Sequence, residues 1–201
     1  MLILSSWDDG SKHDLRLAKL LKKYNIPAIF YIPTCCELSP LEITAIHLLG
    51  FEIGGHTDTH PQDLKKLSPK QQTDEILGNK LWLESILADG SGVLKVNSFC
   101  YPRGRYDFLT ERIVKRCGFT NARTTVQGSI EHPVNKFRTK TSVHVYPETP
   151  RFNKPDWLKE AKRLYIKAKK EDGVFHIWSH SWEIEKFGLW KELEEFFIWM
   201  K

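Results

Sequence analysis

The sequence predicts an α/β protein, a distorted (β/α) barrel of about seven parallel strands formed by a single domain of residues 1–201. Short apolar runs alternate along the chain with longer segments of helical periodicity, which is typical of a parallel sheet wrapped by helices. Residues 28–32 form a continuous apolar run, as expected for a strand buried on both faces. A chain of 201 residues with 41% hydrophobic residues is long enough to bury one core.

The first half of the chain predicts three strands, each followed by a helix. Leucine and alanine side chains recur at near-helical spacing over 14–24. Phe51-Glu52-Ile53 resembles a short strand that enters a glycine-rich turn. The expected elements are strand 2–7, helix 14–24, strand 28–32, helix 40–49, strand 51–54 and helix 68–87.

The second half continues this alternation and contains one irregular region. Asp156 is placed to cap the helix that follows it, and the last helix has apolar residues on one side. The region 128–153, rich in Pro, Asn, Thr and Arg, is expected to form a substrate-shaping loop with a possible strand at 141–146. The remaining expected elements are strand 96–101, helix 107–117, strand 119–123, helix 156–171, strand 174–179 and helix 184–200.

Composition excludes several classes of protein. The net charge is +5, but lysine and arginine are scattered among acidic residues, so a nucleic-acid-binding surface is not expected. No run approaches the roughly 20 apolar residues of a membrane span. The chain starts directly with a strand and without a signal peptide, which predicts a cytoplasmic protein. The four cysteines form no disulfide pattern, and the sequence leaves the oligomeric state open.

Two polar motifs follow predicted strands, Ser-Trp-Asp-Asp-Gly at 6–10 and Gly-His-Thr-Asp-Thr-His at 55–60. Because parallel strands end at the same rim, both motifs are expected at one ligand-binding edge. Two imidazoles and two adjacent carboxylates are enough to bind a divalent metal and leave one carboxylate as a base. The motifs therefore predict a metal-dependent hydrolase. Zinc is the default metal, and cobalt, nickel or iron would suit the same donors.

These motifs resemble those of the polysaccharide deacetylase (NodB-homology) family, carbohydrate esterase family four. A late motif is similar to Trp178-Ser179-His180, so the resemblance runs from the first strand to about residue 182. It implies the same barrel and the removal of acetyl groups from an N-acetylated amino sugar or oligosaccharide. By this resemblance Asp8 is the general base and His180 the general acid. The implied metal ligands are Asp9, His56 and His60.

The third motif of the family is only partly matched. Cys100 stands where the arginine that supports the base is expected, so another cation must take that role. Arg123, at the end of a predicted strand, is the first candidate and Arg103 the second. Tyr101 in the same turn is a further candidate for contacts with substrate or base. The fourth motif, an Asp and Trp pair that contacts the late histidine, has no clear match.

Aromatic residues flank the predicted site. Trp7, Trp178 and Trp182 are placed to stack on sugar rings, although a core role explains each of them equally well. His176 is expected to be a hydrogen-bonded core histidine. Two other functions stay open: a metal-dependent hydrolase of a non-sugar amide or cyclic C–N bond, and a catalytically silent carbohydrate-binding protein.

Overall fold

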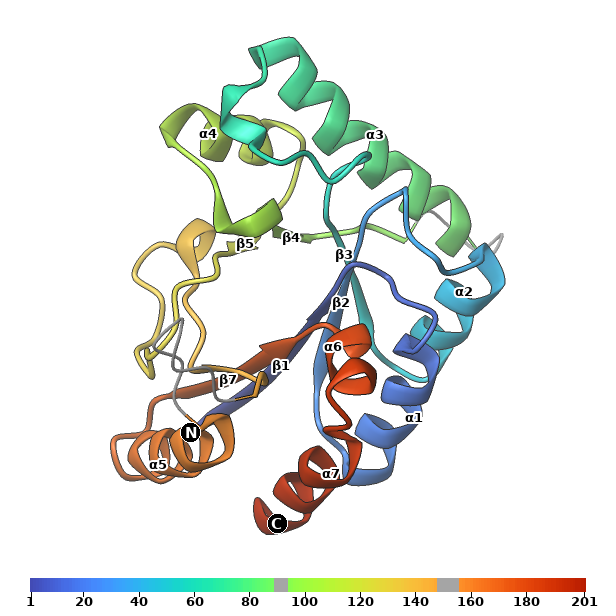
Figure 1. The fold of residues 1–201 in the computed structure, drawn as a ribbon. Helices are drawn as coiled ribbons and strands as arrows, with labels where there is room; N and C mark the ends of the chain where they lie inside the picture. Colours follow the sequence, from blue (N-terminus) through green and yellow to red (C-terminus); the bar gives the residue numbers. More distant parts are fainter. Residues whose placement is uncertain (89–93, 148–155) are drawn as a thin grey trace.

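The computed structural model describes residues 1–88, 94–147 and 156–201, and it contains one curled sheet of seven parallel strands (Figure 1). The strand order is β5-β4-β3-β2-β1-β7-β6, with the first strand between β2 and β7. This confirms the predicted distorted barrel of about seven parallel strands. The strands are β1 (Leu2–Asp8), β2 (Ala28–Ile32), β3 (Glu52–Gly55), β4 (Ser98–Cys100), β5 (Asn121–Arg123), β6 (Val143–His144) and β7 (Val174–Ser179).

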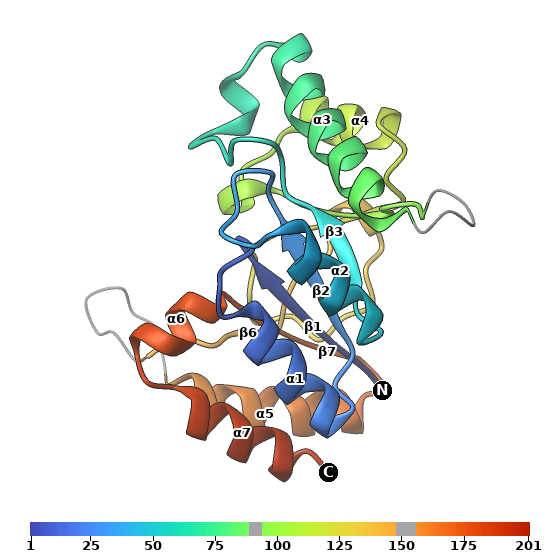
Figure 2. The ribbon, with the colours of Figure 1, turned by 90° about the vertical axis from the view of Figure 1, so that its right-hand side faces the viewer.

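Helices cover the outside of this sheet (Figures 1 and 2). Ser39 and Ser68 each begin a helix with a capping box, and the Asp107 and Asp156 side chains accept backbone N–H groups at two further helix starts. None of the helices in the described ranges is long and apolar enough to cross a bilayer. The helices are α1 (Asp14–Tyr24), α2 (Pro40–Leu48), α3 (Pro69–Leu87), α4 (Phe108–Arg116), α5 (Trp157–Lys170), α6 (Ser181–Lys186) and α7 (Trp190–Trp199).

An irregular segment links the two edges of the curled sheet. Thr139 forms a parallel bridge with Arg123 at the end of β5, and its N–H donates to Ala122 O at 3.0 Å. On the other side, Ser142 N–H donates to His176 O of β7 at 2.8 Å. The regular pairing in the predicted strand 141–146 is limited to Val143–His144. Residues 148–153 of the predicted substrate-shaping loop lie outside the described residues, and none of residues 128–147 lines the pocket described below.

The expectation of one helix over 184–200 is wrong. The chain forms α6 immediately after His180, breaks at Phe187–Leu189, and then forms α7. Gly188 has φ +66°, a conformation that a glycine adopts at no steric cost and that ends a helix. Because α6 begins at Ser181, three residues earlier than expected, its first turn lies at the carboxyl end of β7, next to the predicted site.

Alternate residues of the strands face opposite sides of the sheet. Leu2, Leu4, Arg123 and His176 line a cavity inside the barrel, of about 300 Å³. The residues between them belong to the apolar cluster between sheet and helices, which includes Trp7, Phe30, Phe99, Phe175 and Phe196. The interior therefore holds Arg123 and His176 beside apolar side chains, and the main core lies outside the sheet.

Candidate active site

The predicted base, acid and metal ligands meet in one pocket of about 330 Å³ at the carboxyl ends of the strands. The two early motifs arrive from β1 and β3, and the late histidine follows β7, which pairs with β1. The pocket is lined by Asp8, Asp9, His56, His60, Arg103, Thr125, Trp178, His180 and Trp182.

Asp9, His56 and His60 form a three-donor group that fits a divalent metal. Asp9 Oδ1 lies 3.6 Å from His56 Nε2 and 3.6 Å from His60 Nε2. Ligands about 2.1 Å from a tetrahedral metal are about 3.4 Å apart, close to these separations. Asp9 Oδ1 is buried and has no hydrogen-bond partner within the described ranges, as expected for an atom whose partner is an ion. The pKa shifts of two donors, Asp9 and His60, suit metal binding, whereas that of His56 does not: burial would lower the pKa of His56, but Cys100 and the neighbouring aspartates raise it well above its usual value. Burial alone would raise the pKa of Asp9, but the neighbouring imidazoles of His56, His60 and His180 hold it below its usual range. Burial and the charges of His56 and Arg103 lower the pKa of His60 to about 4, which leaves a neutral imidazole.

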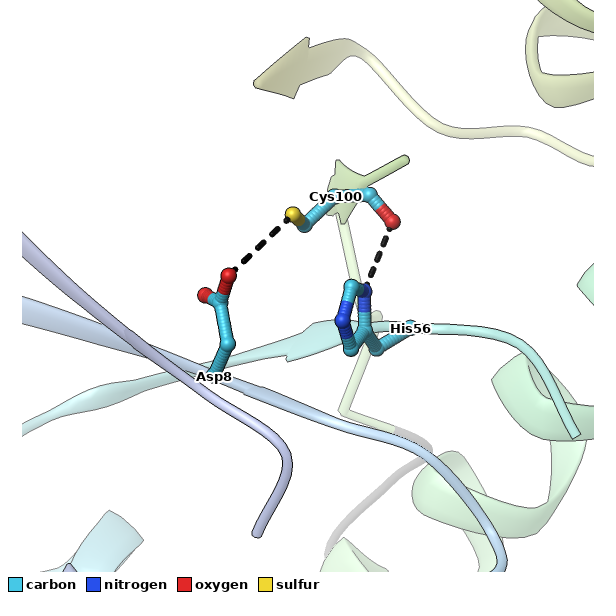
Figure 3. A group of neighbouring side chains, drawn as sticks. All are labelled: Asp8, His56 and Cys100. Carbon is cyan, nitrogen blue, oxygen red and sulfur yellow. Dashed lines mark hydrogen bonds between the residues drawn. The ribbon is translucent and has the colours of Figure 1, made fainter. Parts of the chain in front are cut away.

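The loop that carries the two histidines is held by β4 and α3. His56 Nδ1–H donates to Cys100 O at 2.8 Å, which leaves Nε2 as the free ligand atom (Figure 3). His56 N–H donates to Asn79 Oδ1 at 2.9 Å. Glu75 Oε2, one helical turn earlier, accepts the N–H groups of Asp58 and Thr59 at 3.0 and 2.8 Å. Sequence reasoning missed both α3 residues, although their i,i+4 spacing placed them on one helix face.

Asp8 pairs with Arg123 inside the barrel. The two side chains are 4% and 1% exposed, and Arg123 Nη2 contacts Asp8 Oδ2. Asp8 Oδ1 is buried and forms no hydrogen bond in the described structure, so it remains available as an acceptor. The structure thus brings the first candidate, Arg123, against the predicted base. The second candidate, Arg103, lies at the pocket and has no contact with Asp8 among the hydrogen bonds and ion pairs of the described residues.

Cys100 adds a second potential metal cluster with Asp8 and His56, whose donor atoms lie within 4.8 Å of one another (Figure 3). Arg123 Nη2 also lies 2.9 Å from Cys100 Sγ. A divalent cation placed there would be repelled by this buried guanidinium. Burial also raises the pKa of the Cys100 thiol, which disfavours the thiolate that binds metals. The Asp9, His56 and His60 group is therefore the better metal site.

His180 is oriented by a carboxylate that sequence reasoning did not identify. Its Nδ1–H donates to Glu183 Oε2 at 2.6 Å, and its Nε2 lies 3.6 Å from Asp9 Oδ2. The same Glu183 oxygen accepts His144 Nε2–H at 2.8 Å. Burial opposes ionisation of Glu183, but the hydrogen bonds of the two histidines lower its pKa to about 2. The i,i+3 spacing to His180 was a signal for Glu183, whereas nothing in the sequence pointed to His144.

Residues 2–122, more than half of the chain, match the family model for polysaccharide deacetylases. The chain belongs to the polysaccharide deacetylase family. The matched residues of this family member include both early motifs and Cys100, and the late histidine lies beyond them. No curated protein matches its sequence at a significant level.

Solved structures share the fold of this polysaccharide deacetylase family member. A deacetylase from Streptococcus pyogenes, in complex with acetate, is 24% identical over 74% of this chain and 66% of its own, with a TM-score of 0.63. A family 4 carbohydrate esterase from Streptomyces lividans, also with acetate, is 16% identical over 97% of this chain and 86% of its own, with a TM-score of 0.66. A family pseudoenzyme from Bacillus anthracis is 15% identical over 99% of this chain, with a TM-score of 0.64, and this chain covers 60% of it.

The aromatic candidates divide into two groups. Trp182 is 37% exposed at the pocket, and its Nε1–H donates to Asp9 Oδ2 at 3.3 Å. Trp178 also lines the pocket and stacks on His144 with ring centroids 4.1 Å apart. Trp7 is 0% exposed because it points to the opposite side of β1 from Asp8, so stacking of Trp7 on a sugar is ruled out. Tyr101 is also buried, and its hydroxyl donates to Phe137 O at 3.1 Å, away from the pocket.

Proposed function

We propose that this protein is a metal-dependent hydrolase that removes acetyl groups from an N-acetylated amino sugar or oligosaccharide, with residues 1–201 as one catalytic domain. The observation that carries the proposal is the arrangement of three kinds of group in one pocket. A donor triad for a metal, a separate buried carboxylate and a separate oriented imidazole are the parts that amide hydrolysis needs. Membership of the polysaccharide deacetylase family supports the same reaction.

Asp9, His56 and His60 would hold the metal. Their oxygen and nitrogen donors suit zinc, and cobalt, nickel or iron as well. When bound, a divalent ion supplies Lewis-acid chemistry, because it polarises a carbonyl and makes water more acidic. Three protein ligands leave coordination positions open, as in catalytic sites.

Asp8 would act as the general base. Its Oδ1 is the unpartnered oxygen, so this atom would take the proton of the attacking water. Its Oδ2 contacts the guanidinium of Arg123, which is buried beside the carboxylate and fixes its orientation. Oδ2 would therefore hold the carboxylate in place, and Oδ1 would accept the proton.

His180 would act as the general acid. The amine of an amide is a poor leaving group until it is protonated, so an acid is needed on the other side of the reacting carbon. Because Nδ1–H is held by Glu183, the proton available to the amine is at Nε2. The Glu183 carboxylate also stabilises the positive charge of a protonated His180, and it raises the pKa of this imidazole although burial opposes the shift.

Acetate release after metal exchange tests the proposal. The protein is stripped with a chelator, reloaded separately with zinc, cobalt, nickel or iron, and incubated with chitooligosaccharides. We expect metal-dependent acetate release, no turnover by Asp8→Asn with metal retained, and loss of metal from His56→Ala. Bound metal without acetate would favour a hydrolase of a non-sugar amide or cyclic C–N bond. Sugar binding without turnover on any amide would favour a silent carbohydrate-binding protein.

A further inference from the structure

Arg103 places a positive charge without a counter-ion at the active-site pocket. It lines the pocket and is exposed. Within the described ranges its guanidinium forms no ion pair or hydrogen bond. Its neighbour Arg105 differs, because Nη1 of Arg105 donates to Gln62 O at 3.1 Å and lies 3.6 Å from Asp63. Only one of these two arginines is therefore free to bind a ligand.

The backbone holds Arg103 at this position. It lies in the short 3-10 turn Pro102–Gly104 with φ +56°, a conformation uncommon for a side chain of this size. The following Gly104 has φ +68° and packs against Thr125, where a Cβ would lie 2.1 Å from Thr125 Oγ1. The turn is thus fixed by close packing. A strained residue of this kind at a pocket rim is a feature of functional sites.

The carboxylates of the pocket are already engaged. Asp8 is paired with Arg123, and Asp9 belongs to the metal-binding triad. An anionic group of a ligand would therefore meet Arg103 without competition from a carboxylate of the pocket.

The other wall of the pocket is aromatic. Arg103 follows β4 and Trp182 follows β7, and three strands of the sheet separate β4 from β7. A sugar ring stacked on Trp182 would therefore direct its far side toward Arg103. The pocket volume of about 330 Å³ is at the small end of ligand sites, suitable for one substituted sugar.

We propose that Arg103 binds an anionic group of the substrate, so that the preferred substrates are acetylated amino sugars carrying a carboxylate or a phosphate. This inference depends on the function proposed above. A guanidinium forms charge-assisted hydrogen bonds with either group, often in a bidentate geometry. The acidic substituent would fix the ring orientation that brings the acetamido group to the metal-binding triad.

The test compares one neutral and two acidic sugars. Zinc-loaded protein is assayed for acetate release from N-acetylglucosamine, N-acetylmuramic acid and N-acetylglucosamine 6-phosphate, and binding of each sugar is measured by calorimetry. We expect kcat/KM to favour at least one acidic sugar by about ten-fold, a typical effect of one charge-assisted contact. Arg103→Gln should bring this ratio close to one, and Arg103→Lys should retain part of it. Arg105→Gln, the matched control, should leave the ratio unchanged. High salt should reduce the ratio, because the site is exposed.

The outcomes separate the two proposals. Equal acetate release from neutral and acidic sugars by the wild type, or an equal effect of Arg103→Gln on all of them, overturns the role of Arg103 and leaves the deacetylase function intact. If Arg105→Gln reduced the preference for acidic sugars as much as Arg103→Gln, the preference would come from the overall positive charge near the pocket. That result would also overturn the role of Arg103. If no sugar releases acetate, the deacetylase proposal fails. Calorimetry then decides on Arg103, which is supported only if the acidic sugar binds the wild type more tightly than Arg103→Gln.

Discussion

Replacing Arg123 by methionine removes the counter-charge of Asp8 inside the barrel. The two side chains are 1% and 4% exposed, so water cannot replace the guanidinium. Removing one partner of a buried ion pair lowers the free energy of unfolding by about 3–5 kcal/mol. With a urea m-value of about 2 kcal/mol/M, the unfolding midpoint should fall by about 1.5–2.5 M. Urea titration followed by tryptophan fluorescence measures this shift, and acetate release should fall with it because the base loses its support.

The double variant Asp8→Asn/Arg123→Met completes the cycle. A neutral amide needs no counter-charge, so the double variant should be more stable than Arg123→Met alone, with a coupling energy of at least about 2 kcal/mol. Lys70→Met is the control, because Lys70 and Asp74 form an ion pair of 2.7 Å with side chains 85% and 60% exposed. Lys70→Met should lower the free energy of unfolding by about 0.5 kcal/mol or less. A loss below about 1 kcal/mol for Arg123→Met, or a coupling near zero, would refute the account of this buried pair.

Three further variants test other parts of the structure. Glu183→Gln should lower kcat for acetate release by about 10–100-fold with metal content unchanged, because His180 loses its charged partner; a normal kcat would contradict the orienting role. Asp14 is buried with a pKa raised by burial to about 8, against about 4 in the unfolded chain. Its contribution to stability is complete below about pH 4 and is lost as the pH rises toward 8, so urea unfolding of Asp14→Asn should lack this loss of stability with pH. The double variant Cys100→Arg/Arg123→Cys moves the guanidinium to the neighbouring strand. Its acetate release should exceed that of Arg123→Cys alone by at least about ten-fold. Equal rates would contradict the idea that an arginine at either position can support Asp8.

The strand-end motifs made most of the fold and the convergence of Asp9, His56 and His60 predictable. Asp9 and His56 follow short apolar runs, and in a parallel sheet such runs end at one rim. The period of a strand also decides between the two roles left open for Trp7, because neighbouring residues of a strand face opposite sides of the sheet. Asp8 points into the barrel, so Trp7 points to the helices and has the core role.

Other features depend on tertiary structure and had no local signal. His144 reaches Glu183 because a two-residue strand pairs with β7, across an irregular segment whose path no periodicity indicates. The break between α6 and α7 needs Gly188 at positive φ, whereas the apolar pattern of residues 184–200 continues through it. Long-range pairing decided the first case and a glycine at positive φ the second, so sequence periodicity alone was insufficient.

The arginine beside Asp8 shows how a motif can be incomplete while its aspartate still has a cationic partner. Cys100 and Arg123 are direct partners in the parallel pairing of β4 and β5, so both side chains leave the sheet at the same height and toward the same interior. A guanidinium at either position is long enough to reach Asp8, and the partner position must then hold a small side chain, as Cys100 does. A sequence motif describes residues of a single strand. In the barrel, paired residues of two neighbouring strands can place a functional group at the same position. The requirement is a cation at this level of the barrel interior, and the exchange variant measures whether the supporting strand matters.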